Sequence, residues 1–136
     1  MLLKFNTRIN IGLRLNPNVD ALTIKEITTG KQINKFGLSD NEVIEFIKLY
    51  KNSKLVSIKC LSVHIGSQIT SVKPFKNVLS VIDNVISKTK INFKYIDLGG
   101  GMSIPYSQSE KLFELKQYAR LVNKFSKNNS GENNIF

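Results

Sequence analysis

The sequence predicts an α/β fold with parallel strands in a single sheet. Three apolar segments of strand length, residues 9–15, 55–65 and 93–98, alternate with segments whose apolar residues recur at helical spacing. Consecutive strands are separated by connections long enough for a helix, as right-handed crossovers between parallel strands require. The second and third strands end in small, polar and glycine residues, which predicts a ligand site at the carboxyl edge of the sheet.

The first strand is predicted from a strict alternation that ends at Asn16-Pro17-Asn18, where proline cannot continue a ladder. Arg14 falls on one face of this strand, opposite the apolar residues Ile9, Ile11, Leu13 and Leu15. Residues 19–37 give mixed signals and are expected to form a long, partly irregular connection, a kind of segment that is often functional.

Two helices are predicted around the second strand. Ser39 and Glu42 form a capping box, in which each side chain bonds the other residue's backbone amide, and they predict a helix over 40–51. The next helix is expected to start at residues 71–74, with a proline in its first turn, where a missing N–H costs little. A broad apolar stripe follows it and indicates a helix packed on the sheet.

A second capping box, Ser107 to Glu110, predicts a third helix that continues to about Lys127. The following residues are polar and contain glycine. We therefore expect one domain over 1–127 and a disordered tail over 128–136.

The alternation of the second strand separates its side chains into two sets. The residues predicted to pack on helices are Leu61, Val63 and Ile65. Those on the other face are Cys60, Ser62 and His64. Arg14 lies on the corresponding face of the first strand. Since burial of an unpaired arginine is costly, this face is expected to meet an anionic or polar ligand.

Two short motifs at the strand ends indicate chemistry. A lone histidine such as His64 is more often structural than functional, but Gly66 and Ser67 add close backbone approach and a hydroxyl. Gly99-Gly100-Gly101 follows the third strand directly, and successive N–H groups there favour an anion site, with a flexible turn as the alternative. Neither a Gly-x-Gly-x-x-Gly motif nor a Walker A loop is present, and one His with one Cys cannot build a zinc site.

Composition limits the class of protein. The 136 residues have the size of one domain, and their net charge of +10 comes from dispersed lysines, which favours a solvated surface over a nucleic-acid interface. Cys60 is the single cysteine, so no disulfide framework is predicted. No apolar stretch reaches the roughly 20 residues of a membrane helix, and the N-terminus lacks a signal peptide's apolar region. We expect a cytoplasmic protein without a membrane or nucleic-acid partner.

Five motifs taken together resemble the diaminopimelate decarboxylases, which are fold-type III pyridoxal-phosphate enzymes. They are Leu13-Arg14-Leu15-Asn16-Pro17-Asn18-Val19-Asp20-Ala21, Thr28-Thr29-Gly30, Asn34-Lys35-Phe36-Gly37, His64-Ile65-Gly66-Ser67-Gln68 and Asp97-Leu98-Gly99-Gly100-Gly101. Their order and spacing also match, over roughly residues 9 to 122. The resemblance implies a partial TIM (β/α)8 barrel of the alanine-racemase-like type, with about three βα units. Gln68 resembles the diaminopimelate enzyme more than the ornithine enzyme, which usually has glycine there.

The resemblance also implies a cofactor, pyridoxal 5'-phosphate, and roles for matching residues. His64 would stack on the pyridoxal ring, Ser67 and the glycine amides would hold the phosphate, and Arg14 would lie near the ring. The implied cofactor-binding residues are therefore Arg14, His64, Ser67, Gly99, Gly100 and Gly101. The family's reaction converts meso-diaminopimelate to L-lysine and CO₂, and the intact family forms homodimers.

The sequence departs from the family at its catalytic residues. The family's Schiff-base lysine lies in a Tyr-Ala-x-Lys-Ala-Asn-like strand before the position of Arg14; no such motif is present, and Lys4 lacks that context. No Glu-Pro-Gly-Arg segment and no C-terminal β-domain are found either. No catalytic residue is therefore assigned. The expectation is an internal piece of the enzyme that is inactive alone, either the product of a broken reading frame or one part of a split enzyme.

Other functions stay open from the sequence. They are a non-catalytic module that binds pyridoxal phosphate or a partner, a related decarboxylase of arginine or carboxynorspermidine, and a basic nucleic-acid binder, which the dispersed lysines disfavour. An incomplete barrel also has open strand edges, so we expect marginal stability, partial disorder or aggregation of the isolated chain.

Overall fold

The computed structural model describes residues 7–20, 36–105, 112–129 and 134–135, in which helices and parallel strands alternate. The strands and helices, in chain order, are β1 (Ile9–Leu15), α1 (Asp40–Tyr50), β2 (Val56–Val63), α2 (Lys73–Thr89), β3 (Tyr95–Asp97), α3 (Leu115–Asn128) and β4 (Asn134–Ile135). The predicted α/β alternation is confirmed, and the second and third strands are shorter than expected.

The strands form one parallel sheet in the order β1-β2-β3-β4. Sequence order equals spatial order, as it does in consecutive units of a barrel. The three expected strands are accompanied by a fourth, because Asn134 and Ile135 pair with Tyr95 and Ile96.

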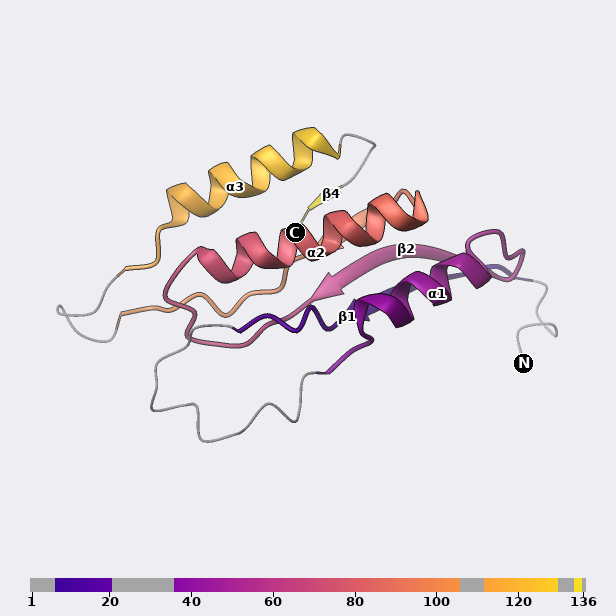
Figure 1. The fold of residues 1–136 in the computed structure, drawn as a ribbon, viewed down its shortest axis with the longest axis horizontal. Coiled ribbons are helices and arrows are strands. Elements are labelled where there is room, and N and C mark those ends of the chain that lie inside the picture. Colours follow the sequence, from indigo (N-terminus) through magenta and orange to yellow (C-terminus); the bar gives the residue numbers. More distant parts are fainter. Residues whose placement is uncertain (1–6, 21–35, 106–111, 130–133, 136) are drawn as a thin grey trace.

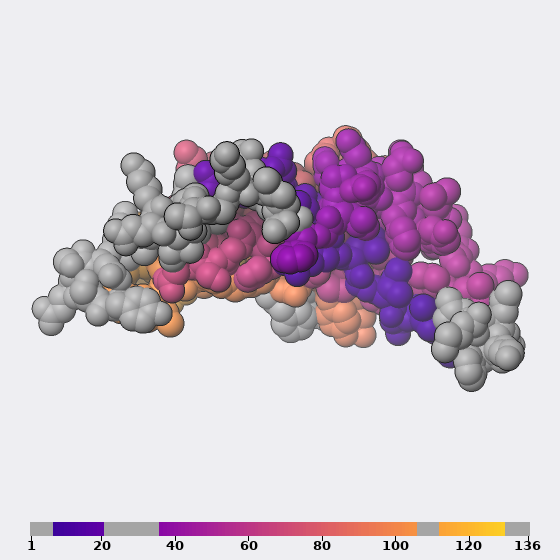
Figure 2. Space-filling model, turned by 90° about the horizontal axis from the view of Figure 1, so that it is seen from below, coloured from indigo at the N-terminus to yellow at the C-terminus, as the bar shows by residue number. Residues whose placement is uncertain are grey.

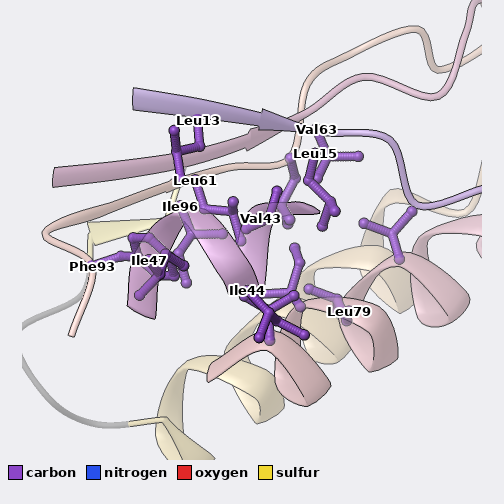
Figure 3. Packing of buried hydrophobic residues seen from close by; sticks show 14 of the residues in the cluster. Leu13, Leu15, Val43, Ile44, Ile47, Leu61, Val63, Leu79, Phe93 and Ile96 are labelled. Carbon is purple, nitrogen blue, oxygen red and sulfur yellow. The ribbon is translucent and has the colours of Figure 1, made fainter. Parts of the chain in front are cut away.

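Helices α1, α2 and α3 lie side by side along the sheet (Figure 1). Their apolar stripes meet the strand side chains in one core, shown close up in Figure 3. The register aligns Leu13, Leu61 and Ile96 in a row across three strands. All three are buried, Leu61 and Ile96 completely, and the first strand's predicted apolar face is thereby confirmed.

An irregularity in β2 reverses the alternation in the first half of the strand. Ile11 pairs with Ile58, whereas the next residue, Gly12, pairs with Cys60, so Lys59 is an extra residue. A β-bulge of this kind shifts the facing pattern by one position. Ile58 and Leu61 are both buried although three positions separate them, which strict alternation does not predict.

Helix α1 begins as predicted. The Ser39 hydroxyl accepts a hydrogen bond from the Glu42 amide at 3.3 Å, and the Glu42 carboxylate accepts one from the Ser39 amide at 2.8 Å. These hydrogen bonds lower the pKa of Glu42. The bonds of the capping box satisfy amides that would otherwise lack a partner at the helix start.

The third helix is predicted to start near residues 107–110, and this prediction is wrong for residues 112–114, which the structure describes. Residues 112–114 are not helical, α3 starts at Leu115, and Leu112 and Leu115 are exposed rather than part of a buried stripe. The capping box at 107–110 lies outside the described residues.

The C-terminal segment expected to be disordered includes described structure. Asn128 ends α3, and the Asn129 side chain donates a hydrogen bond to Asp83 at 2.8 Å. Residues 134–135 form β4, while 130–133 and 136 lie outside the described part. The boundary at 127 between a domain and a tail stays a prediction.

Strand β1 is an edge of the sheet among the described residues. Figure 2 shows residues of this segment at the surface of one face, in indigo. An edge with unpaired backbone groups favours association with another chain, so the expected aggregation of the isolated chain stays a prediction. No described helix has both the length and the apolar character needed to cross a bilayer.

The buried row predicts a sharp contrast between two leucine substitutions. Leu61→Ala should lower the free energy of unfolding by about 2–5 kcal/mol, because it leaves a cavity in the centre of the row. Leu49→Ala, at a side chain that is 75% exposed, should change it by less than about 0.5 kcal/mol. Thermal unfolding followed by circular dichroism measures both. Equal effects would contradict the placement of Leu61 in the core.

Candidate functional site

Two loops that follow β2 and β3 lie side by side at the carboxyl edge of the sheet. The Ile69 amide donates a hydrogen bond to the Gly101 carbonyl at 2.8 Å, and the Ser103 amide donates one to the Ile69 carbonyl at 2.9 Å. Ile69 and Met102 thus form a parallel bridge beyond the ends of the strands. This bridge holds residues 64–68 against residues 99–101.

Two of the three consecutive glycines are required by this close packing. Gly99 and Gly101 have φ angles of +70° and +87°, in the region that side chains disfavour. A Cβ on Gly99 would lie 2.5 Å from the Val63 carbonyl oxygen, and one on Gly101 would overlap the Gly66 carbonyl. Any larger residue at either position would therefore push the two loops apart.

Gly100 has no such structural reason to be glycine. Its φ is not positive, and a Cβ placed on it would meet nothing within 4 Å. Within the described part of the chain, no protein acceptor bonds the amides of Gly100 or Gly101. An open position with two available N–H groups fits an anion such as a phosphate group.

The Gly99 amide is not equivalent to the other two. It donates a hydrogen bond to Asp97 Oδ1 at 2.8 Å, across two residues. Because a backbone amide has one proton to donate, the donors left for an anion are the Gly100 and Gly101 amides. The predicted set of three glycine amides is thereby reduced to two in this conformation.

His64 and Ser67 come from the neighbouring loop. Both side chains are exposed, and among the described residues neither has a hydrogen-bond partner. The Nδ1 atom of His64 would lie 3.0 Å from a Cβ on Gly99, and the Ser67 Cα would lie 3.1 Å from one on Gly101. The structure therefore places both residues beside the glycine loop, as the sequence predicts.

Arg14 lies at the same edge but is not seen in contact with the loops. Its register partner is Ser62, and Ser62 pairs with Asp97, so these three residues form a row next to the buried leucine row. The Arg14 guanidinium lies over the Phe36 ring, 5.6 Å from its centroid. Arg14 is exposed, so the predicted face is confirmed.

The segment after the long connection supports Arg14 through its backbone. Leu38 exchanges hydrogen bonds with the strand end, donating to the Arg14 carbonyl at 2.8 Å and accepting from the Asn16 amide at 2.7 Å. Gly37, with φ of +112°, approaches so closely that a Cβ would lie 2.6 Å from the Arg14 carbonyl oxygen. The sequence did not predict this contact, although a glycine at the end of the Asn34-Lys35-Phe36-Gly37 motif is compatible with such a close approach.

Cys60 lies on the same face of β2 as Ser62, two residues before it. It is half-buried beside Gly12 and Tyr95. Burial raises the pKa of its thiol, and the negative charge of Asp97 raises it further, while the Asp97 backbone partly opposes both. The thiol therefore stays protonated near neutral pH and is a poor nucleophile. We assign it no catalytic role.

Other candidate sites are weaker. A hollow of about 480 Å³ at the start of α3 is lined by residues 112–117 and Arg120 and shares none of the residues described above. Among the described residues, no group of three or more His, Cys, Asp or Glu side chains is placed to hold a metal ion.

The sequence was compared with protein families and with curated proteins. The family model for the pyridoxal-dependent decarboxylases, pyridoxal-binding domain, matches residues 1–135. The diaminopimelate decarboxylase of Haemophilus influenzae is 41% identical over 100 residues, which are 71% of this chain and 24% of that protein. The enzyme of Campylobacter jejuni is 32% identical over 120 residues, which are 86% of this chain and 30% of that protein.

Solved structures agree in fold. Diaminopimelate decarboxylase from Helicobacter pylori, complexed with L-lysine, superposes with a TM-score of 0.77 at 28% identity, over 98% of this chain and 34% of that one. The M. jannaschii enzyme in complex with L-lysine superposes with a TM-score of 0.74 at 29% identity, over 98% of this chain and 33% of that one. The chain thus spans about a third or less of the length of these relatives. It belongs to the pyridoxal-dependent decarboxylases, as part of their pyridoxal-binding domain.

Proposed function

We propose that the chain forms the cofactor-binding part of a diaminopimelate decarboxylase, which releases CO₂ from meso-diaminopimelate to give L-lysine. The observation that supports this most strongly is the pairing of the two loops, which leaves the Gly100 and Gly101 amides open to an anion. The family's domain binds pyridoxal, and a phosphate group is the anion that such a site would accept.

Different residues of this chain would hold the phosphate group and the ring of the cofactor. The amides of Gly100 and Gly101 and the Ser67 hydroxyl donate hydrogen bonds to the phosphate, for which the loops provide room. His64, exposed beside Gly99, offers a flat ring to pack against the pyridine ring. Arg14 adds positive charge at the same edge of the sheet. The bound cofactor supplies an electron sink for the carbanion that forms as CO₂ leaves.

Support for the proposed substrate comes from the relatives rather than from the described site. The curated relatives named above are diaminopimelate decarboxylases, and the two solved structures hold L-lysine, the amino acid that the proposed reaction forms. Gln68 also matches the diaminopimelate pattern. Decarboxylases of arginine or carboxynorspermidine are alternatives within the family.

A second candidate is a module that binds pyridoxal phosphate without catalysis. The exposed His64 and Ser67 and the open Gly100 favour cofactor binding irrespective of catalysis. The 136-residue chain has no lysine in the family's Schiff-base context, so catalysis would need residues from elsewhere.

The first prediction separates binding from catalysis. The 136-residue chain should bind pyridoxine 5'-phosphate saturably, because its loops provide the phosphate donors. This probe has an alcohol in place of the aldehyde and so cannot form imines with the abundant lysines. With pyridoxal phosphate and carboxyl-labelled meso-diaminopimelate, the same chain should release no labelled CO₂. Absence of saturable probe binding would refute the cofactor role, and CO₂ release would refute the expected inactivity.

The second prediction tests the open glycine. Gly100→Asp should weaken probe binding by about tenfold or more, because it places a negative charge against the phosphate. Gly100→Asn, which has the same size without the charge, should weaken it less. Both variants should fold, since a Cβ at this position meets no atom within 4 Å.

Gly101→Ala is the contrasting variant. Its Cβ would overlap the Gly66 carbonyl, so it should destabilise the chain by about 1–3 kcal/mol. Thermal unfolding measures stability, and isothermal titration with the probe measures binding. Equal destabilisation by Gly100→Asn and Gly101→Ala would show that the two glycines have the same structural role, contrary to the structure.

A further inference from the structure

Asp97 ends β3 and fixes the turn that follows it. Its Oδ1 atom accepts the hydrogen bond from the Gly99 amide at 2.8 Å. Gly99 adopts a left-handed conformation with φ of +70°, which an isolated glycine would share among several alternatives. A side-chain acceptor two residues before the amide selects one of these conformations.

The same turn is packed against β2. A Cβ on Gly99 would lie 2.5 Å from the Val63 carbonyl oxygen and 3.2 Å from the His64 Cα, so the glycine backbone lies directly on the end of that strand. A change in the Gly99 conformation would therefore disturb the backbone next to His64. Through Gly99, Asp97 can therefore influence both loops of the site.

The negative charge of Asp97 would not favour the binding of a phosphate group at this site. A carboxylate near a phosphate dianion raises the free energy of the bound state. Asp97 is exposed, and it occupies the row with Ser62 and Arg14 at the site's edge. The favourable contribution that the structure shows is its oxygen as an acceptor for the Gly99 amide.

We propose that Asp97 is a positioning residue, whose side-chain oxygen holds the Gly99 amide and so keeps the Gly100 and Gly101 amides turned to a phosphate group. This inference rests on the proposed cofactor role. Asparagine has the same oxygen without the charge, so Asp97→Asn should preserve the function of the residue. Alanine removes the acceptor and releases the turn.

The test compares Asp97→Asn and Asp97→Ala in the full 136-residue chain, with pyridoxine 5'-phosphate and inorganic phosphate as probes. Asp97→Asn should bind the probe as tightly as the unmodified chain or more tightly. Asp97→Ala should bind about tenfold more weakly, because the loop must be ordered on binding. Inorganic phosphate should show the same order of affinities, since the proposed effect acts on the phosphate donors.

Two further readouts separate positioning from a general loss of structure. Hydrogen exchange of the Gly99 amide, observed by nuclear magnetic resonance, should become faster in Asp97→Ala and stay slow in Asp97→Asn. The reactivity of the Cys60 thiol should rise equally in both variants, because each removes the charge that helps to raise the thiol's pKa. A fold that is merely loosened by alanine would not give equal thiol reactivity.

The inference is overturned if Asp97→Ala binds the probes like the unmodified chain, or if Asp97→Asn is as weak as Asp97→Ala. If the unmodified chain binds neither probe, the proposed cofactor role fails. In that case the hydrogen exchange of the Gly99 amide still tests the role of Asp97. Equal exchange rates in the two variants overturn its positioning role. Exchange that is faster in Asp97→Ala but not in Asp97→Asn supports that role.

Discussion

The alignment of side chains across the parallel sheet determines which strand residues pack under the helices and which face the other side. Leu13, Leu61 and Ile96 are paired neighbours in one buried row beneath the helices. Since successive residues of a strand point to opposite faces, the next row, Arg14, Ser62 and Asp97, faces away from the core. Burial of the first row thus places Arg14, Ser62 and Asp97 together on the opposite face of the sheet, near the carboxyl ends of their strands.

The three consecutive glycines at that edge serve different purposes. Gly99 and Gly101 have left-handed backbones and lie against carbonyl groups of β2 and its loop, so the fold itself excludes a side chain there. Gly100 is open on its α-carbon, and no contact among the described residues requires a glycine at this position. The bridge between Ile69 and Met102 holds both loops in register and unites His64 and Ser67 with these amides.

Much of this arrangement was predictable from local sequence rules. Alternation located β1 and the face of Arg14, and the capping box located α1, because both patterns depend on neighbouring residues. The bulge at Lys59 and the late start of α3 were not predictable, since they arise from strand pairing and packing. For the site, sequence indicated both loops but not the use of the Gly99 amide by Asp97, which depends on the conformation of a flexible residue.

Chemical-shift mapping by nuclear magnetic resonance, with pyridoxine 5'-phosphate added to the isotope-labelled chain, tests the central claim that the two loops form one phosphate site. The account predicts saturable shifts confined to residues 64–68 and 97–101, largest at the Gly100 and Gly101 amides. Shifts spread over lysine-rich surfaces, or saturable shifts elsewhere that leave both loops unchanged, would contradict it.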